Sequence, residues 1–181
     1  MTYPQKIIKR RDMLIIFSGL PAVGKSTIAK QLAQMIKATY LRVDTIEQSL
    51  RHQSPQKEIG PEGYFILYAL AKENLQLGNT VITDSVNDLR IIRDDYRNIA
   101  QSLACPFLEI EILCTDQKLH QARAETRITD IEGLIPPSFE AINKRQYERW
   151  NRAHLQLDTA ILSIDECVKH IQKVITLIQY P

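Results

Sequence analysis

The sequence predicts an α/β fold in which about five parallel strands form one sheet with helices on both faces. Short apolar runs alternate with longer segments of helical periodicity along the chain. Strands that are separated by helices pair in parallel through crossover connections, so this alternation favours a three-layer α/β/α architecture. The length of 181 residues, with 44% hydrophobic and 24% charged residues, is typical of one globular unit, and we expect a single domain over residues 1–181.

The first strand and helix illustrate the pattern. Residues 13–19 (MLIIFSG) form a continuous apolar run closed by a glycine, which is typical of a strand buried on both faces of a parallel sheet. Residues 26–36 then carry apolar side chains at helical spacing. The same reasoning predicts further strands at 39–43, 80–83, 107–114 and 154–162. It predicts further helices from residue 45, over 62–77, 89–103, 117–128 and 138–150, and from Ser163, which has capping-box spacing to Glu166.

Charge and cysteine content exclude several classes of protein. The 23 Lys and Arg residues nearly balance 21 Asp and Glu residues, so the net charge of +2 gives no general attraction to nucleic acid or membranes. Cys105, Cys114 and Cys167 are an odd number without CxxC spacing, which favours reduced thiols in the core. No apolar run approaches the roughly 20 residues of a membrane helix. Residues 1–12 form a short basic lead-in without a cleavage site, so we expect a cytoplasmic protein.

Residues 19–26 (GLPAVGKS) match the phosphate-binding pattern GxxxxGK[ST]. The two glycines allow backbone angles that turn consecutive amide groups toward a phosphate. Lys25 places a cation between the β- and γ-phosphates, and Ser26 supplies a hydroxyl to Mg²⁺. The motif lies between a buried strand and an amphipathic helix, as this mechanism requires. The predicted nucleotide-binding residues of this loop are Gly19, Ala22, Val23, Gly24, Lys25, Ser26 and Thr27.

Two predicted strands end in an aspartate. Asp44 follows the strand at 39–43, and Asp84 follows the strand at 80–83. The carboxyl ends of parallel strands meet at one edge of a sheet, so both carboxylates should face the phosphate loop. Phosphoryl transfer uses one carboxylate to orient or deprotonate the acceptor hydroxyl and another to hold Mg²⁺ or its waters. Both are therefore candidate substrate residues, and either one is a candidate base. Asp84 is also a candidate metal residue. The alternative interpretation of Asp44 is that it caps the next helix.

Two further polar residues are candidates for contact with the substrate. Asn87 lies in a polar turn after Asp84, and Arg51 lies seven residues beyond Asp44. Arg51 could reach an anionic or polyhydroxyl substrate. Each residue also has a simpler interpretation, because Asn87 or Asp88 can cap the next helix and Arg51 can belong to a solvated helix surface.

Arg123 and Arg127 lie four residues apart and should share one face of the predicted helix 117–128. Two guanidinium groups on one face suit the charge of a transferring phosphoryl group, or one of them stacks on adenine. A salt-bridged solvent face that includes Glu125 is the alternative. The loop at 129–137 has the length and the glycine of a closing lid, so we expect a lid over about residues 117–137.

These residues resemble the small P-loop kinases of the shikimate kinase, gluconate kinase, chloramphenicol phosphotransferase and polynucleotide 5′-kinase group. They resemble more closely the kinases of the AAA_33 type that have no assigned substrate. The resemblance covers nearly the whole chain, and the segments that carry it are residues 19–27, 42–48, 84–87, 123–129 and 157–159. It implies the P-loop NTPase fold with a helical lid, ATP and Mg²⁺ as cofactors, and phosphorylation of an alcohol.

The resemblance also implies roles for individual residues. Asp44 corresponds to the base or acceptor-orienting residue, and Asp84 to the aspartate that organises the metal and acceptor site. Residues 45–51 lack the arginine-rich acceptor signature of shikimate kinases and the spacing of polynucleotide kinases, so neither substrate is implied. The lid arginines and the loop beside adenine correspond to Arg123, Arg127, Asp158 and Thr159.

The predicted function is transfer of the γ-phosphate of Mg-ATP to a hydroxyl of a small molecule. One alternative is a polynucleotide 5′-hydroxyl kinase, for which Arg145, Arg149, Trp150 and Arg152 would form a basic helix end; that end is otherwise a solvated face. Another is a nucleotide-dependent switch that hydrolyses ATP or GTP without an acceptor, although no guanine-binding NKxD motif is present. We expect a nucleotide and a small hydroxylated substrate as partners, and neither membrane nor nucleic acid. The pattern predicts neither the acceptor nor the oligomeric state.

Overall fold

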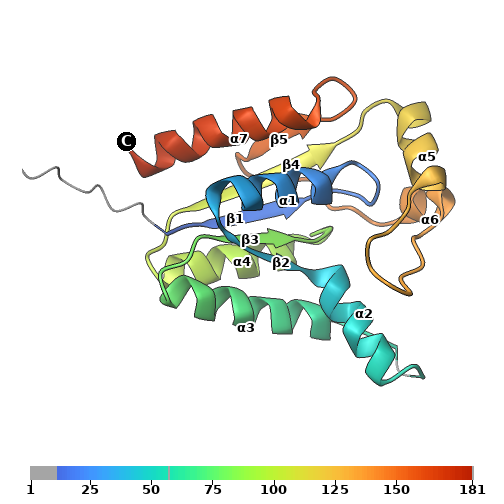
Figure 1. Ribbon diagram of the computed structural model, residues 1–181, viewed down its shortest axis with the longest axis horizontal. Helices are drawn as coiled ribbons and strands as arrows, with labels where there is room; N and C mark the ends of the chain where they lie inside the picture. The colour runs from blue at the N-terminus through green and yellow to red at the C-terminus, as the bar shows by residue number, and fades with distance from the viewer. Residues whose placement is uncertain (1–11, 57, 181) are drawn as a thin grey trace, which may run out of the picture.

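The computed structural model describes residues 12–56 and 58–180, in which helices cover a five-stranded sheet (Figure 1). The strands are β1 (Leu14–Ser18), β2 (Thr39–Arg42), β3 (Val81–Asp84), β4 (Phe107–Leu113) and β5 (Leu155–Asp158). The helices are α1 (Lys25–Ile36), α2 (Val43–Gln53), α3 (Glu62–Gln76), α4 (Arg90–Ser102), α5 (Gln117–Thr126), α6 (Phe139–Lys144) and α7 (Ile164–Gln179). The predicted basic lead-in, except for Asp12, lies outside the described residues.

The strand order is β2-β3-β1-β4-β5, and all neighbouring strands are parallel. Asp84 at the end of β3 pairs in register with Phe17 of β1 and with Arg42 of β2. The ends of these three strands therefore lie at one level, and the phosphate-binding loop begins directly after β1. Figure 1 shows α2, α5 and α6 at the end of the sheet toward which the strands point.

The core consists of two apolar layers that share β1. Met13, Ile15 and Phe17 point into the layer under α1 and α7, whereas Leu14 and Ile16 point into the layer under α3 and α4, and all five side chains are fully buried. This alternation is the period of two that a strand requires. The predicted three-layer α/β/α fold is confirmed, with β1 buried on both faces as expected (Figure 1).

The predicted helix over 138–150 is too long, because α6 ends at Lys144. The chain then runs irregularly along the side of the sheet that α4 covers. Arg152 donates to the buried Glu109 of β4, with Nε 2.9 Å from Oε2, and also pairs with Asp94 of α4. The Trp150 ring stacks on His154 at 4.0 Å. These contacts between distant segments outweigh the local helical pattern, and Arg152 is an internal ion-pair residue rather than part of a basic helix end.

The three cysteines are free, and only Cys167 is buried, whereas Cys105 and Cys114 are half-buried. The three thiols are therefore unpaired, as predicted, but only one of them lies in the core. None of the helices in residues 12–56 and 58–180 is long and apolar enough to cross a membrane.

Candidate active site

The phosphate-binding loop has backbone angles that its residue types explain. Gly19 (φ 139°) and Gly24 (φ 91°) both have positive φ. A Cβ atom on Gly19 would lie 2.3 Å from the carbonyl oxygen of Ile112, so only glycine fits there. Ala22 also has a positive φ of 67°, which costs a non-glycine residue on the order of 1 kcal/mol. Such locally unfavourable backbone is typical of segments preorganised for a ligand.

Lys25, the lysine of the motif, is buried and paired with Asp84. Its Nζ lies 2.8 Å from Asp84 Oδ1, and the two side chains are 8% and 1% exposed. The Tyr40 hydroxyl donates to Asp84 Oδ2 at 2.6 Å, and the Ser26 hydroxyl also bonds to this carboxylate. Burial raises the pKa of Asp84, but the charge of Lys25 and these hydrogen bonds outweigh burial, so the pKa lies below its ordinary value. Asp84 is therefore an anion that fixes Lys25.

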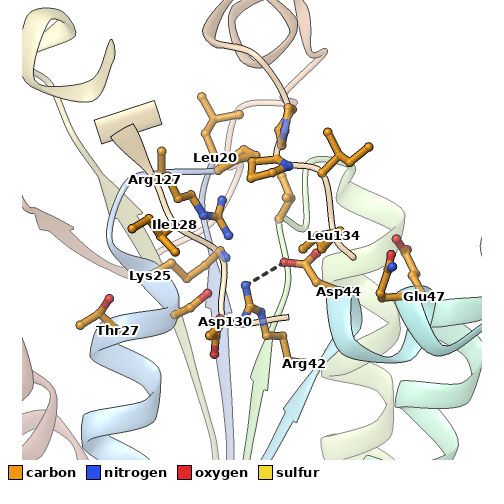
Figure 2. Close-up of a pocket in the computed structure, with 18 of the residues that line it drawn as sticks. Leu20, Lys25, Thr27, Arg42, Asp44, Glu47, Arg127, Ile128, Asp130 and Leu134 are labelled. Atoms are coloured by element: carbon orange, nitrogen blue, oxygen red, sulfur yellow. Dashed lines mark hydrogen bonds and ion pairs between the residues drawn. The ribbon is translucent and has the colours of Figure 1, made fainter. Parts of the chain in front are cut away.

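Arg42 joins the two strand-end aspartates that the sequence singled out. Its Nη2 lies 3.2 Å from Asp44 Oδ2, the contact drawn as a dashed line in Figure 2, and its Nε lies 3.8 Å from Asp84 Oδ2. Its Nη1 donates to Oδ1 of Asp130, in the loop after α5, at 2.8 Å. The Arg42 side chain is only 3% exposed, so one buried cation faces three carboxylates.

A cavity of about 1540 Å³ lies between the phosphate-binding loop, α2 and the loop after α5 (Figure 2). Asp44 is 35% exposed and is accessible from this cavity. The structure thus brings the phosphate loop, a strand-end carboxylate and both lid arginines together. The predicted site residues that line the cavity are Ala22, Gly24, Lys25, Ser26, Thr27, Asp44, Arg51, Arg123 and Arg127.

The two lid arginines do not share a helix face as predicted, because α5 ends at Thr126 and Arg127 has extended backbone. Arg123 donates from Nη1 to Thr159 Oγ1 at 2.8 Å and from Nη2 to the Thr159 carbonyl oxygen at 3.2 Å. Arg127 directs its guanidinium group into the cavity near Lys25 (Figure 2). Arg123 therefore anchors α5, and Arg127 is the arginine that is available to a ligand.

Asp158 and Thr159, predicted beside adenine, connect β5 to neighbouring segments. Asp158 Oδ1 accepts from the backbone N–H groups of Thr115 and Ala160, at 3.1 and 2.9 Å. Thr159 Oγ1 bonds to the carbonyl oxygen of Val23 at 2.8 Å, so this loop braces the phosphate-binding loop. Among the residues that the structure describes, neither belongs to the lining of the cavity, and their contact with adenine stays a prediction.

The two remaining candidate substrate residues lie in different environments. Asn87 is fully buried, has a φ of 52°, and donates from Nδ2 to the Phe17 carbonyl oxygen at 3.0 Å, so in the structure it ties the turn after β3 to β1. Arg51 lines the cavity and donates to Glu47 Oε2 at 3.1 Å. Burial raises the pKa of Glu47, although the Arg51 charge opposes this effect. A substrate role fits the placement of Arg51 better than that of Asn87.

Sequence reasoning did not single out three residues that complete the site. Tyr40 and Arg42 lie two residues apart on β2, so both point to one face and reach Asp84. Lys30 lies four residues after Ser26 on α1 and lines the same cavity. Their spacing was visible in the sequence, but two of the carboxylates that they contact, Asp84 and Asp130, belong to distant segments.

Oxygen donors suited to Mg²⁺ lie beside Lys25. They are the Ser26 hydroxyl and the Asp84 carboxylate, which bond to one another. Within residues 12–56 and 58–180, no group of three or more His, Cys, Asp or Glu side chains is arranged to hold a metal ion. Mg²⁺ commonly binds through one or two protein oxygens together with substrate phosphates and water, so these two donors fit that use.

The fold is shared with several solved structures. A candidate kinase from Chloroflexus aurantiacus has a TM-score of 0.74 at 19% identity, with 93% of this chain and 98% of that chain covered. The Mycobacterium tuberculosis APS kinase CysC, solved with AMPPNP and APS, has a TM-score of 0.67 at 20% identity, covering 91% and 98%. A gluconokinase from Sinorhizobium meliloti has a TM-score of 0.65 at 17% identity, covering 94% and 95%. The sequence has no significant match among curated proteins.

The sequence itself matches a protein family. Residues 14–132 match the model of AAA_33, an AAA domain, and this segment runs from β1 through the phosphate-binding loop to the loop after α5. It includes Lys25, Asp44, Asp84 and Arg127, which the cavity and its ion pairs bring together. Because the matched segment is well over half of the chain, the protein belongs to the AAA_33 family.

Proposed function

We propose that the protein is an ATP-dependent phosphotransferase that moves the γ-phosphate of Mg-ATP to a hydroxyl group of a small molecule. The observation that carries this proposal is that Lys25, on a complete phosphate-binding loop, and Asp44 line one cavity. The structural relatives support it, since one is an APS kinase solved with AMPPNP and APS and another is a gluconokinase. This function needs a nucleotide side and an acceptor side, and the cavity offers both.

On the nucleotide side, the loop backbone and the start of α1 bind the phosphates of ATP. Amide groups at a helix N-terminus attract an anion, and Lys25 adds a full positive charge. Asp84 keeps this charge in place through the 2.8 Å ion pair. Ser26 and Asp84 would hold the Mg²⁺ that accompanies ATP. When bound, Mg²⁺ neutralises negative charge on the phosphate oxygens.

On the acceptor side, Asp44 orients the hydroxyl group and accepts its proton. The acceptor oxygen forms a bond to the γ-phosphorus as the bond between that phosphorus and the β–γ bridging oxygen breaks, and ADP leaves. The proton passes to an oxygen of Asp44 and then to solvent. Arg42 lies 3.2 Å from Asp44 Oδ2 and so fixes the position of the carboxylate that accepts the proton.

Arg127 is the residue best placed to stabilise charge that develops on the transferred phosphoryl group. Its guanidinium group points into the cavity near Lys25 (Figure 2). Positively charged groups aimed at the developing charge are a large source of rate enhancement in phosphoryl transfer. Arg123 acts differently, because its bonds to Thr159 fix α5 against the loop after β5.

The test is an ADP-release assay with Mg-ATP and a panel of hydroxylated metabolites, using wild type, Lys25→Ala and Asp44→Asn. We expect Lys25→Ala to abolish turnover. Asp44→Asn should lower kcat by about 10²-fold or more while leaving the Kd for ATP within about threefold, because a general base supplies about 10²–10⁴-fold. Glu73→Gln, which removes one negative charge from the exposed side of α3, is the matched control and should retain activity.

The same assay distinguishes the alternatives. Retention of more than about a tenth of the rate in Asp44→Asn would contradict the role of Asp44 as base. ATP hydrolysis that no acceptor stimulates would favour a switch, and stimulation only by a 5′-hydroxyl oligonucleotide would favour a polynucleotide kinase.

A further inference from the structure

Asp130 lies in the loop after α5, and its side chain reaches across the cavity to two cations. Its Oδ1 accepts from Arg42 Nη1 at 2.8 Å, and its Oδ2 bonds to Lys30 Nζ. Arg42 ends β2 and Lys30 lies on α1, so the two cations belong to separate elements of the core. Asp130 itself is 56% exposed and lines the cavity beside Asp44 and Lys25 (Figure 2).

The two cations are supplied by the core, whereas the carboxylate between them comes from the loop. The Arg42 side chain is 3% exposed and is fixed on two sides by Asp84 and Asp44. Arg42 also lines the cavity, and its Nη1 is the atom that donates to Asp130. A buried guanidinium group with one edge toward a cavity favours an anion there. Lys30, 39% exposed, adds a second positive charge at the same position.

We propose that Lys30 and Arg42 form a subsite for an anionic group of the acceptor, a carboxylate or a phosphate, and that Asp130 occupies this subsite when no acceptor is bound. This inference rests on the proposed phosphotransferase function. Arg42 also bonds to Asp44, so an anion in the subsite holds the rest of a small acceptor next to the proposed base. The acceptor class is therefore a small alcohol that carries a carboxylate or phosphate a few atoms from its hydroxyl group.

Asp130 competes with an incoming anion for the subsite as a charged carboxylate. Hydrogen bonds from Lys30 and Arg42 hold the pKa of Asp130 well below its ordinary value, so protonation near neutral pH does not release it. A ligand that competes with an internal group binds only to the molecules whose subsite is free. Its apparent Kd is therefore the intrinsic Kd divided by the fraction of molecules with a free subsite. Removal of the Asp130 charge should therefore strengthen anion binding.

The experiment is isothermal titration of inorganic phosphate, and separately of malonate, into protein saturated with Mg²⁺ and a non-hydrolysable ATP analogue. The analogue occupies the phosphate-binding loop, so the added anion reports the second subsite. The variants are wild type, Asp130→Asn, Asp130→Asn combined with Lys30→Gln, and Glu132→Gln. Glu132 is an exposed carboxylate two residues from Asp130, so Glu132→Gln is matched in charge and in loop position.

We expect Asp130→Asn to bind at least one of the two anions about tenfold more tightly than wild type, as for a subsite that Asp130 fills about nine-tenths of the time. Glu132→Gln should change the affinity less than twofold. Adding Lys30→Gln should remove the gain. A preference for phosphate or for malonate identifies the anionic group.

Unchanged or weaker binding in Asp130→Asn overturns the proposal and makes Asp130 a lid-closing contact that assists ligands. An equal gain in Glu132→Gln also overturns it, because the gain would then reflect net charge alone. Failure of wild type to bind the ATP analogue contradicts the phosphotransferase function instead. In that case a gain in Asp130→Asn that is lost when Lys30→Gln is added still reports the subsite, so the two failures are distinguishable.

Discussion

At the scale of single residues, Asp84 is the group on which the charges of the site depend. It is 1% exposed, pairs with Lys25 at 2.8 Å, and accepts from Tyr40 at 2.6 Å. The guanidinium group of Arg42 lies 3.8 Å away. A buried carboxylate is stable only when cations and donors compensate its lost hydration, and here they do so from two elements, α1 and β2.

We predict that Asp84→Asn lowers the free energy of unfolding by about 3 kcal/mol, because it leaves the buried Lys25 charge without its anion. Tyr40→Phe removes only one hydrogen bond to a charged group and should cost about 1.5 kcal/mol. Denaturant unfolding of the nucleotide-free proteins at pH 7 measures both values. A smaller loss in Asp84→Asn than in Tyr40→Phe would show that the ion pair does not contribute as argued.

The same pair gives a pH dependence with a definite sign. The pKa of Asp84 in the folded protein lies below its ordinary value of 3.8, so folding favours the ionised form. The stability that the Asp84 carboxylate contributes is fully present above the pKa of this group in the unfolded chain. It is lost as the pH falls through the lower pKa of the folded protein. The stability difference between wild type and Asp84→Asn should accordingly shrink below about pH 4.

At the scale of elements, α5 is bonded directly to the phosphate-binding loop. The His120 side chain is buried, and its Nε2 lies 2.8 Å from the Pro21 carbonyl oxygen. A carbonyl oxygen only accepts, so this ring nitrogen donates the hydrogen. The ring of Phe139 on α6 packs against His120, with centroids 5.4 Å apart. Together with the bonds of Arg123 to Thr159, these contacts hold α5 against the phosphate-binding loop and the loop after β5.

We predict that His120→Ala weakens Mg-ATP binding about five- to tenfold, because one hydrogen bond that holds the loop contributes up to about 1.5 kcal/mol. His120→Gln keeps an N–H donor and should recover part of the affinity. Gln121→Ala, on the exposed side of the same helix, serves as the control. Calorimetric Kd values test the series, and equal affinity in His120→Ala and wild type would mean that the loop holds its shape without α5.

At the scale of the whole molecule, three separate parts of the chain line the proposed nucleotide site. The phosphate-binding loop belongs to the layer under α1 and α7, whereas Asp44 lies in the first turn of α2 on the far side of β3. The segment after α5 closes the cavity from a third direction (Figure 2). A ligand in this cavity contacts all three parts, so its binding should stabilise the entire fold.

We predict that Mg-ATP at about 100 times its Kd stabilises the protein by about 2.7 kcal/mol. For a chain of this size, that corresponds to a rise in Tm of about 5–10 °C. Lys25→Ala should abolish the shift, and GTP should give a smaller shift than ATP because the guanine-binding NKxD motif is absent. Thermal denaturation followed by fluorescence measures it, and no shift in wild type would contradict nucleotide binding altogether.

The sheet, the phosphate-binding loop and the two strand-end aspartates were predictable from the sequence. These features depend on local signals: the run of buried residues in β1, the glycines before Lys25, and the place where β2 and β3 end. The period of the apolar residues shows that one face of a segment is buried, whichever segment covers that face. The strands and most helices were therefore predictable. The end of α6 was not, because Arg152 and Trp150 form tertiary contacts that the helical pattern does not contain.

The pairs of charged groups that contact one another were not predictable from the sequence, because they depend on how distant segments pack. Arg42 reaches Asp84 because β2 and β3 pair in one register, and the two residues are far apart in sequence. Lys30 and Asp130 are separated by 100 residues, and their ion pair depends on how the loop after α5 crosses the cavity. The partner of a long charged side chain depends on packing geometry at the level of a few ångströms. The sequence therefore predicted the loop and the strand ends that lie beside the cavity, and the folded chain determined which cations face it.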